Sequence, residues 1–418
     1  MEQSENMVSP TSGRRASGRR SSGRRRYAVL AVGVGVLLAG CAKNAPQDMF
    51  QPEGSNARLI DGLQRELFYV SGGVGLIVFG FVGYAVWKFK DRGQDIPEQT
   101  HGNPKLEILL TILPAIILAV VAVPSVAAVF ELDKKDNDCV INVTGQQWWW
   151  EYDYVQGSTC GGVEIPKSIV TTGELVIPAS VDVLLRITSR DVIHSYWIPK
   201  LNGKRDAVPG RLHTLRMQAD QPGLYTGQCT EFCGLSHSRM RQAAVALTTA
   251  DFQTWVTNQT ADYVAPEAGT LAAAGEGTFQ AQCSKCHQVN NLVTADGTPV
   301  LAEPDLYIVS GAAPNLSKLM TRTAFGGWTF DLISAECRDK LWNADPDEFG
   351  ALYLQGVTPE CFDEAALRTW LRNAPAMKPM YADPAKLAAT GGKTRGMPNL
   401  NLTEDQIDEL VAYLLERK

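Results

Sequence analysis

The chain has 418 residues, 45% of them hydrophobic, and a formal net charge of −6. Its apolar residues gather in separate stretches, which favours several modules on a membrane anchor over one large soluble enzyme. The acidic balance argues against a nucleic-acid-binding protein. It suits the steering of a basic partner protein, although excess surface acid is also a common solubility feature.

The N-terminus predicts a signal peptide over residues 1–40. Residues 1–26 are polar and rich in Arg, and residues 27–38 are almost wholly apolar. The sequence Leu38-Ala39-Gly40-Cys41 resembles the lipobox of bacterial lipoproteins and predicts a lipid anchor at Cys41. An ordinary signal peptide, or an uncleaved anchor with a chance cysteine, is the alternative. Cleavage removes seven Arg and two Glu from 39 basic and 45 acidic residues, so that 32 and 43 remain and the net charge is −11.

Two apolar stretches, residues 67–89 and 106–130, predict two transmembrane helices within residues 65–132. Each is long enough to cross a hydrocarbon core of about 30 Å. Basic residues gather around the connection, and acidic residues follow the second stretch: Lys88, Lys90, Arg92 and Lys105, then Glu131 and Asp133. The positive-inside rule therefore places the connection in the cytoplasm, and residues 41–64 and everything after the second stretch outside it.

Residues 133–258 predict an antiparallel β-sandwich, because short β-branched and aromatic runs are separated by Gly and Pro. A linker is expected at residues 259–274, which are rich in Ala and contain Pro266. Helical segments with long loops are expected over residues 275–418. The clearest is the amphipathic run from Glu404 to Leu415, which follows the helix-capping residue Thr403.

The segment from Cys229 to Met240 carries a set of soft metal ligands. Two cysteines stand four residues apart, a histidine four further on and a methionine three beyond that. Thiolate, imidazole and thioether favour copper over hard cations. A second thiolate permits both sulfurs to bridge two copper ions, which then share one electron. With a main-chain carbonyl and an upstream histidine, the expected ligands are His194, Cys229, Glu231, Cys233, His237 and Met240.

Other interpretations of these residues exist. Cys229 and Cys233 are close enough in sequence for a small disulfide loop, and His194 suits a hydrogen-bonded core position. Structural zinc is the competing metal, and the methionine counts against it.

A second cofactor motif is Cys283-Ser-Lys-Cys286-His287, which is typical of covalent c-type haem attachment with His287 as proximal ligand. A disulfide or half of a zinc site is the alternative. The distal ligand is expected downstream, at Met377, Met380 or Met397. We favour Met397, because Gly396-Met397-Pro398-Asn399 resembles the methionine loop of small c-type cytochromes; Met380 is second. The loop around Pro314 resembles the one whose proline carbonyl accepts a hydrogen bond from the haem-ligating imidazole.

Residues 189–240 resemble cytochrome c oxidase subunit II throughout. The resemblance rests on Asp191-Val-Ile-His194-Ser, Asp206-Ala-Val-Pro-Gly-Arg211, Pro222-Gly-Leu-Tyr225 and the metal-ligand segment, and Thr111-Ile-Leu-Pro-Ala-Ile116 agrees. It covers roughly residues 60–250. With the haem motif, it implies a multi-domain chain: a transmembrane α-helical hairpin, a cupredoxin-like β-sandwich and an all-α class I cytochrome c domain.

The resemblance implies a function in respiration. Electrons would pass from a donor, cytochrome c or a bc1-type complex, through the chain's own haem to the copper pair. They would then reach subunit I, where oxygen is reduced to water with proton translocation, and subunit III is a further implied partner. The chain is then an oxidoreductase subunit that carries electrons to a catalyst it does not contain. Its implied place is the bacterial cell membrane, multi-pass, with both cofactor domains outside the cytoplasm.

Several residue roles follow from the same resemblance. In the family's aromatic segment the first tryptophan lies over the copper pair and accepts the electron, which implicates Trp148 and its neighbour Trp149. Trp149 stands where the family usually has tyrosine, and Trp150 is expected in the core. The side chain of Glu231 would reach a Mg or Mn ion shared with subunit I. Glu107 matches a glutamate at a proton-uptake path; a snorkelling interfacial carboxylate is the alternative.

One segment and four cysteines have no role in this scheme. Residues 321–360 form an insertion with no assigned role. Four further cysteines, two in each extracytoplasmic domain, predict the disulfides Cys139–Cys160 and Cys337–Cys361.

Three other kinds of protein match the sequence less well. They are the copper domain of nitrous oxide reductase, a quinol oxidase subunit II, which lacks copper ligands, and a copper delivery or storage protein.

Overall fold

The computed structural model describes residues 45–91, 93, 101–135, 137–289, 313–382 and 396–418. The expected signal peptide and the lipid anchor at Cys41 lie outside the described residues.

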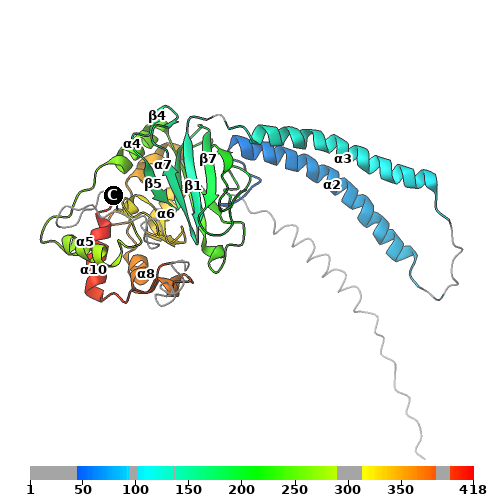
Figure 1. The fold of residues 1–418 in the computed structure, drawn as a ribbon. Helices are drawn as coiled ribbons and strands as arrows, with labels where there is room; N and C mark the ends of the chain where they lie inside the picture. Colours follow the sequence, from blue (N-terminus) through cyan, green and yellow to red (C-terminus); the bar gives the residue numbers. More distant parts are fainter. Residues whose placement is uncertain (1–44, 92, 94–100, 136, 290–312, 383–395) are drawn as a thin grey trace, which may run out of the picture. The chain divides into compact units, whose positions relative to one another are not determined.

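Helices α2 (Ser55–Lys88) and α3 (Pro104–Leu132) are both long and apolar enough to cross a membrane (Figure 1). Their large apolar side chains are exposed along most of their length, as expected for helices that face lipid. Asn103 caps α3 by accepting a hydrogen bond from the amide of Leu106. Helix α2 begins ten residues before the expected boundary at 65, because its polar first turn is hydrogen-bonded to the sandwich. The side-chain amide of Asn56 donates to the carbonyl of Arg216, 2.8 Å away.

One sheet of the sandwich has five strands in the order β10-β7-β1-β2-β5. The strands are β1 (Val140–Gln146), β2 (Trp149–Tyr154), β5 (Ile169–Thr172), β7 (Val183–Ser189) and β10 (His213–Met217). The expected antiparallel arrangement is wrong in one pair here, since β1 runs parallel to β7. The two strands are far apart in the sequence, which leaves room for the crossover that a parallel pair needs.

The second sheet has the order β11-β12-β6, with β12 parallel to β6. Its strands are β11 (Gly223–Gln228), β12 (Arg241–Leu247) and β6 (Glu174–Pro178), and two smaller pairs are β3 (Thr159–Cys160) with β4 (Val163–Glu164) and β8 (His194–Tyr196) with β9 (Arg205–Ala207). Apolar side chains of both sheets, among them Ile141, Leu175 and Val245, form the buried core. The predicted disulfide Cys139–Cys160 is confirmed. Helix α4 (Thr249–Thr260), capped by Thr248, follows the last strand.

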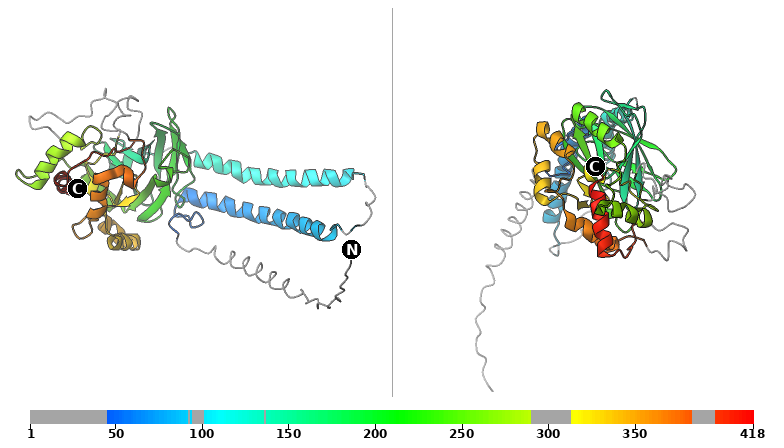
Figure 2. Two further views of the ribbon diagram at one scale, coloured as in Figure 1. Left: turned by 90° about the horizontal axis from the view of Figure 1, so that it is seen from below. Right: turned by 90° about the vertical axis from the view of Figure 1, so that its left-hand side faces the viewer.

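The described part of the C-terminal region, residues 271–289, 313–382 and 396–418, is mainly helical, and Figure 2 shows its helices from two further directions. It contains α5 (Leu271–Gln282), α6 (Ala335–Trp342), α7 (Pro346–Leu354), α8 (Glu364–Met377) and α10 (Glu404–Leu415), and the 3-10 turn η2 (Leu319–Thr321). The all-α expectation is incomplete, because β13 (Ala324–Phe325) and β14 (Phe330–Asp331) form a short hairpin. The irregular stretch before α5 spans residues 261–270.

Helices α5 and α10 pack on each other through Phe279 and Tyr413, whose ring centroids lie 5.3 Å apart. The predicted α10 begins at Glu404, where Thr403 and Gln406 form a capping box. The predicted disulfide Cys337–Cys361 is also confirmed, and it closes the insertion at residues 321–360. This helix pair and the insertion frame the cavity described below.

Candidate metal centre and the adjoining cavity

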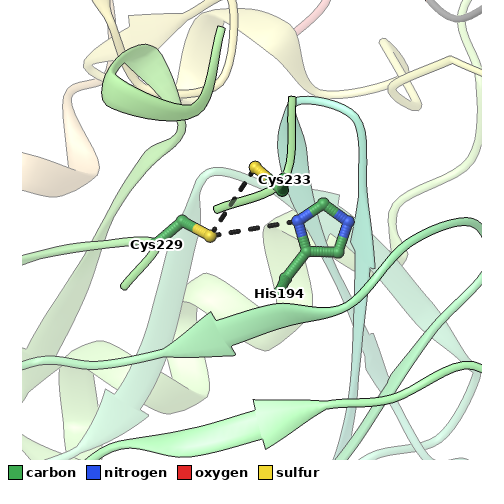
Figure 3. A group of neighbouring side chains, drawn as sticks. All are labelled: His194, Cys229 and Cys233. Carbon is green, nitrogen blue, oxygen red and sulfur yellow. Dashed lines mark hydrogen bonds between the residues drawn. The ribbon is translucent and has the colours of Figure 1, made fainter. Parts of the chain in front are cut away.

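The expected copper ligands come from two parts of the sandwich. His194 opens β8, and the other five residues belong to the loop between β11 and β12, which includes the 3-10 turn η1 (His237–Arg239). The loop is held in place at its end, where the amide of Cys229 donates to the carbonyl of Met240 at 2.9 Å. Figure 3 shows His194, Cys229 and Cys233 facing one another.

The structure brings all six donor groups together. The sulfurs of Cys229 and Cys233 lie 3.8 Å apart, and both cysteines are free thiols. Nδ1 of His194 and the carbonyl oxygen of Glu231 lie 3.9 and 3.3 Å from the Cys229 sulfur. On the other side, Nδ1 of His237 and the sulfur of Met240 lie 3.5 and 3.8 Å from the Cys233 sulfur. Each sulfur therefore has one imidazole and one further donor beside it.

The charges around these donors favour metal binding. Oδ1 of Asp191 lies 2.8 Å from Nε2 of His194, which leaves Nδ1 facing the cysteines. Burial alone would lower the pKa of His194, but hydrogen bonds with Asp191 and Cys229 outweigh it and raise the pKa. The hydrogen bond with Cys233 lowers the pKa of Cys229 below that of an ordinary cysteine and raises that of Cys233. A lowered thiol pKa favours the thiolate, which is the form that binds a metal.

The donor set fits a pair of soft metal ions. Two thiolates, two imidazoles and a thioether select copper rather than Mg²⁺ or Ca²⁺, and the near-symmetrical arrangement about two sulfurs provides ligands for two ions. Cys229, Cys233 and His194 are buried, so the site is shielded from water. A disulfide between Cys229 and Cys233 is not formed.

Three tryptophans occupy the turn and strand beside the loop. Trp148 is 2% exposed and its indole nitrogen donates to the carbonyl of Cys233 at 3.1 Å. Trp149 is also buried and lines the adjoining cavity. Trp150, expected in the core, is buried and packs edge-on against His194 with ring centroids 5.7 Å apart. Trp148 is thus bonded directly to the backbone of a candidate metal ligand.

A cavity next to this turn contains the residues of the expected haem site. Cys283, Cys286, His287 and Pro314 all line it. Nδ1 of His287 lies 2.8 Å from the carbonyl of Pro314. Because a carbonyl only accepts, Nδ1 carries the proton and Nε2 is left as a ligand for a metal. Burial lowers the pKa of His287, which also favours the neutral, ligating form. The mainly apolar lining suits a flat, apolar macrocycle.

Two of the three candidate methionines line the same cavity. The Met397 sulfur lies 3.1 Å from the indole nitrogen of Trp370, and the Met380 sulfur lies 3.3 Å from the Met397 amide. Met377 ends α8, and no contact with the cavity is recorded for it among the described residues. Met397 and Met380 are therefore the candidate methionine ligands in this cavity.

The segment after α8 joins the cavity to the metal loop. Tyr381 packs on Trp148 with ring centroids 5.2 Å apart, and Ser236 donates to the carbonyl of Pro379. The ammonium of Lys378 donates to the carbonyls of Trp148 and Gly326 at 2.9 and 2.7 Å, and burial lowers the pKa of Lys378 to about 7. Sequence reasoning missed these residues. A lysine and a tyrosine between a helix and a loop carry no pattern that distinguishes them from surface residues.

Glu107 lies in the first turn of α3, and its side chain is exposed. The side chain of Glu231 is exposed as well, while its carbonyl faces Cys229.

Two long apolar helices followed by a β-sandwich with a cluster of buried soft donors define a membrane-associated, cupredoxin-like protein. Comparison with known proteins agrees. The family model described as cytochrome c oxidase subunit II, periplasmic domain, matches residues 139–247, and that of the transmembrane domain matches residues 44–128.

Two relatives that are at least 30% identical give the same result. Cytochrome c oxidase subunit 2 of Bacillus sp. (strain PS3) is 30% identical over 92% of this chain and 95% of its own length. The same subunit of Alkalihalophilus pseudofirmus is 32% identical over 67% of this chain and 82% of its own. The solved periplasmic domain of subunit II from Bradyrhizobium japonicum is 28% identical, with a TM-score of 0.27, and the match covers 30% of this chain and 95% of that one.

The chain belongs to the cytochrome c oxidase subunit II family. It is therefore a membrane-associated subunit of a haem–copper oxidoreductase complex that works in respiratory electron transport, with a domain outside the cytoplasm. The family also implies a dinuclear copper site.

Proposed function

We propose that this chain accepts electrons from a donor cytochrome c or bc1-type complex and passes them, through its own haem c and a copper pair, to subunit I. There oxygen is reduced to water with proton translocation, and subunit III completes the assembly. When bound, the two cofactors supply the one-electron redox chemistry. The residues of the chain hold these groups, exclude water and place donor and acceptor close together.

The copper assignment rests on one observation: three further donors of the loop and His194 lie around the two free cysteine sulfurs, which are 3.8 Å apart. We assign His194, Cys229, the carbonyl of Glu231, Cys233, His237 and Met240 as ligands of the copper pair. Asp191 fixes the ring of His194 with Nδ1 toward the metal. Because Cys229, Cys233, Met240 and His194 are buried, they limit rearrangement when an electron arrives or leaves.

The haem assignment rests on His287, whose Nδ1 is committed to Pro314 and whose two neighbouring cysteines line the same cavity. We assign Cys283 and Cys286 as the attachment points, His287 as proximal ligand and Met397 as distal ligand. The C-terminal region is then a class I cytochrome c domain with a short β hairpin added. Tyr381 and Trp148, in ring contact, stand between the cavity and the copper loop.

The remaining assignments concern the membrane and the partner subunits. Helices α2 and α3 cross the membrane as a hairpin, so that the protein is multi-pass with both cofactor domains outside, and Cys41 carries a lipid. Glu107, at the inner end of α3, serves proton uptake into subunit I. The exposed carboxylate of Glu231 reaches a Mg or Mn ion at the interface with subunit I.

The absorption spectrum of the purified chain after copper reconstitution tests this function. We expect c-type haem bands, the near-infrared band of mixed-valence copper and two copper ions per chain. Cys233→Ser removes one of the two thiolates that would hold the copper pair, so the near-infrared band should disappear while the haem bands stay. Ser238→Ala is the matched control, because Ser238 is exposed in the same loop. A wild-type chain that lacks the near-infrared band after reconstitution would overturn the copper assignment.

A further inference from the structure

The segment at residues 321–360, expected to be an insertion with no assigned role, lies against the sandwich. Its contacts meet at Glu174, the first residue of β6, which is 1% exposed. A buried carboxylate is costly unless its oxygens are hydrogen-bonded. All the hydrogen bonds recorded for its side chain among the described residues come from the insertion.

Three residues of the insertion donate to Glu174. The amide of Thr323 lies 2.9 Å from Oε1, and the Thr323 hydroxyl donates to the same oxygen. The indole nitrogen of Trp328 lies 3.1 Å from Oε1. The hydroxyl of Tyr353 donates to Oε2 at 2.8 Å. Both carboxylate oxygens are thus satisfied by residues that lie 149 to 179 positions further along the chain.

Arg322 adds a buried cation beside this carboxylate. It is 4% exposed and donates to the Thr172 hydroxyl at 2.8 Å and to the carbonyl of Asn315 at 2.7 Å. Burial lowers the pKa of Arg322 to about 10, and the negative charge of Glu174 opposes this shift. The positive charge of Arg322 and the negative charge of Glu174 therefore offset each other in the protein interior.

A second group of contacts lies beside the metal loop. The amide of Arg241 donates to the carbonyl of Gly327 at 3.0 Å, and the Thr329 hydroxyl donates to the carbonyl of Arg239. Gly327 has a φ of +72°, and a β-carbon there would lie 2.2 Å from the carbonyl oxygen of Trp148. Only glycine permits this approach of two backbones.

From these contacts we propose that the segment Arg322–Tyr353 is an internal clamp, which closes on Glu174 and fixes the C-terminal region on the sandwich. The linker at 261–270 is then not the principal attachment. A flexible tether would only raise the effective concentration of one domain near the other. The clamp instead holds one arrangement, in which Trp148 is covered by Tyr381, Gly327 and Lys378. An external donor therefore docks on the C-terminal region, since the face of Trp148 is closed to it.

Cutting the linker in the purified full-length oxidase tests the clamp. A protease recognition sequence inserted between Ala268 and Gly269, both exposed, permits cleavage there. Neither disulfide crosses the cut, so only non-covalent contacts remain between the fragments. We expect the C-terminal fragment to co-elute with the complex in gel filtration after cleavage. The readout is attachment alone, so it does not depend on whether electrons reach copper, and a failure of the proposed function leaves this test valid.

Glu174→Ala leaves four donor groups, on Thr323, Trp328 and Tyr353, without a partner, and we expect the cut fragment to dissociate roughly tenfold faster or more. Glu164→Ala is the matched control, because Glu164 is an exposed carboxylate of the same sandwich, on β4. If Glu174→Ala does not accumulate, the double variant Trp328→Phe with Tyr353→Phe removes two donors and keeps the rings. It should also dissociate faster than wild type.

Two results would overturn the clamp. One is release of the C-terminal fragment from the wild-type complex as soon as the linker is cut. The other is equal dissociation of the Glu174→Ala and Glu164→Ala chains or, where the double variant carries the test, equal dissociation of that variant and wild type.

Discussion

The indole nitrogen of Trp148 donates a hydrogen bond to the carbonyl of Cys233 at 3.1 Å, while the ring of Trp148 packs on Tyr381 at 5.2 Å. One residue thus contacts both the proposed copper loop and the segment that lines the proposed haem cavity. We predict that Trp148→Ala slows copper reduction about tenfold or more, equivalent to about 1.4 kcal/mol of barrier. Transient absorption after rapid reduction of the haem measures this rate.

Trp148→Phe separates the two contacts, because it keeps an aromatic ring and loses the indole donor. Its rate should lie between wild type and Trp148→Ala. Trp342→Phe is the control, since Trp342 is 41% exposed on α6 and makes no recorded contact with the metal loop. Equal rates in all four chains would remove Trp148 from the electron path.

Asp191 is predicted to act on copper through His194. Asp191→Asn weakens the hydrogen bond that holds Nδ1 of His194 toward the cysteines, and loss of such a partner lowers metal affinity about 10- to 100-fold. Competition with a copper chelator measures the affinity. Asp182→Asn, at an exposed carboxylate of the same sandwich, should bind copper like wild type. An unchanged affinity in Asp191→Asn would show that the ring is fixed by packing alone.

The choice between the two cavity methionines is testable with a pair of variants. Both Met397→Ala and Met380→Ala should retain covalently attached haem, because Cys283 and Cys286 are untouched. We expect only Met397→Ala to lose the spectrum of a six-coordinate, methionine-ligated haem. The reverse outcome would assign the distal position to Met380.

A pH dependence of stability is predicted at Glu151. This residue is 7% exposed, and burial raises its pKa although Arg190, 2.9 Å away, opposes the shift. A carboxyl whose pKa is raised on folding binds more protons in the native state than in the unfolded state. The free energy of unfolding therefore falls as pH rises from the unfolded pKa of 4.5 to the raised folded pKa.

Glu151→Gln cannot ionise, so its free energy of unfolding should lack this fall. Denaturant titrations at a series of pH values rising from the unfolded pKa of 4.5 provide the comparison. Glu164→Gln, exposed on β4, is expected to follow wild type. Parallel curves for wild type and Glu151→Gln would show that the pKa of Glu151 is not raised on folding.

Local patterns in the sequence predicted much of the fold and the site. Four of the expected donors lie within one loop: Cys229, Cys233, His237 and Met240. Because they are close in the sequence, the local fold of the loop is enough to bring them together. Thr403 and the apolar face behind it predicted α10 for the same reason. Four cysteines remain besides those expected to bind lipid, copper and haem, two in each extracytoplasmic domain, and this even number predicted both disulfides.

Long-range pairing was not predictable in the same way. The parallel pairs of β1 with β7 and of β12 with β6 depend on crossovers that strand periodicity does not encode. In the sequence, Glu174 looks like an ordinary polar residue at the start of an apolar strand, and its partners lie 149 to 179 residues away. The start of α2 at Ser55 depends on the contact between Asn56 and Arg216 rather than on apolar composition.

Electron transfer within the chain is the central claim, and one measurement tests it directly. The purified chain, loaded with both cofactors, is mixed with less than one equivalent of reductant in a stopped-flow spectrometer, and the haem and near-infrared bands are followed together. We predict that the haem signal is reduced first and then reoxidises at the same rate as the near-infrared copper signal changes. Haem that stays reduced while the copper signal remains constant would contradict the account.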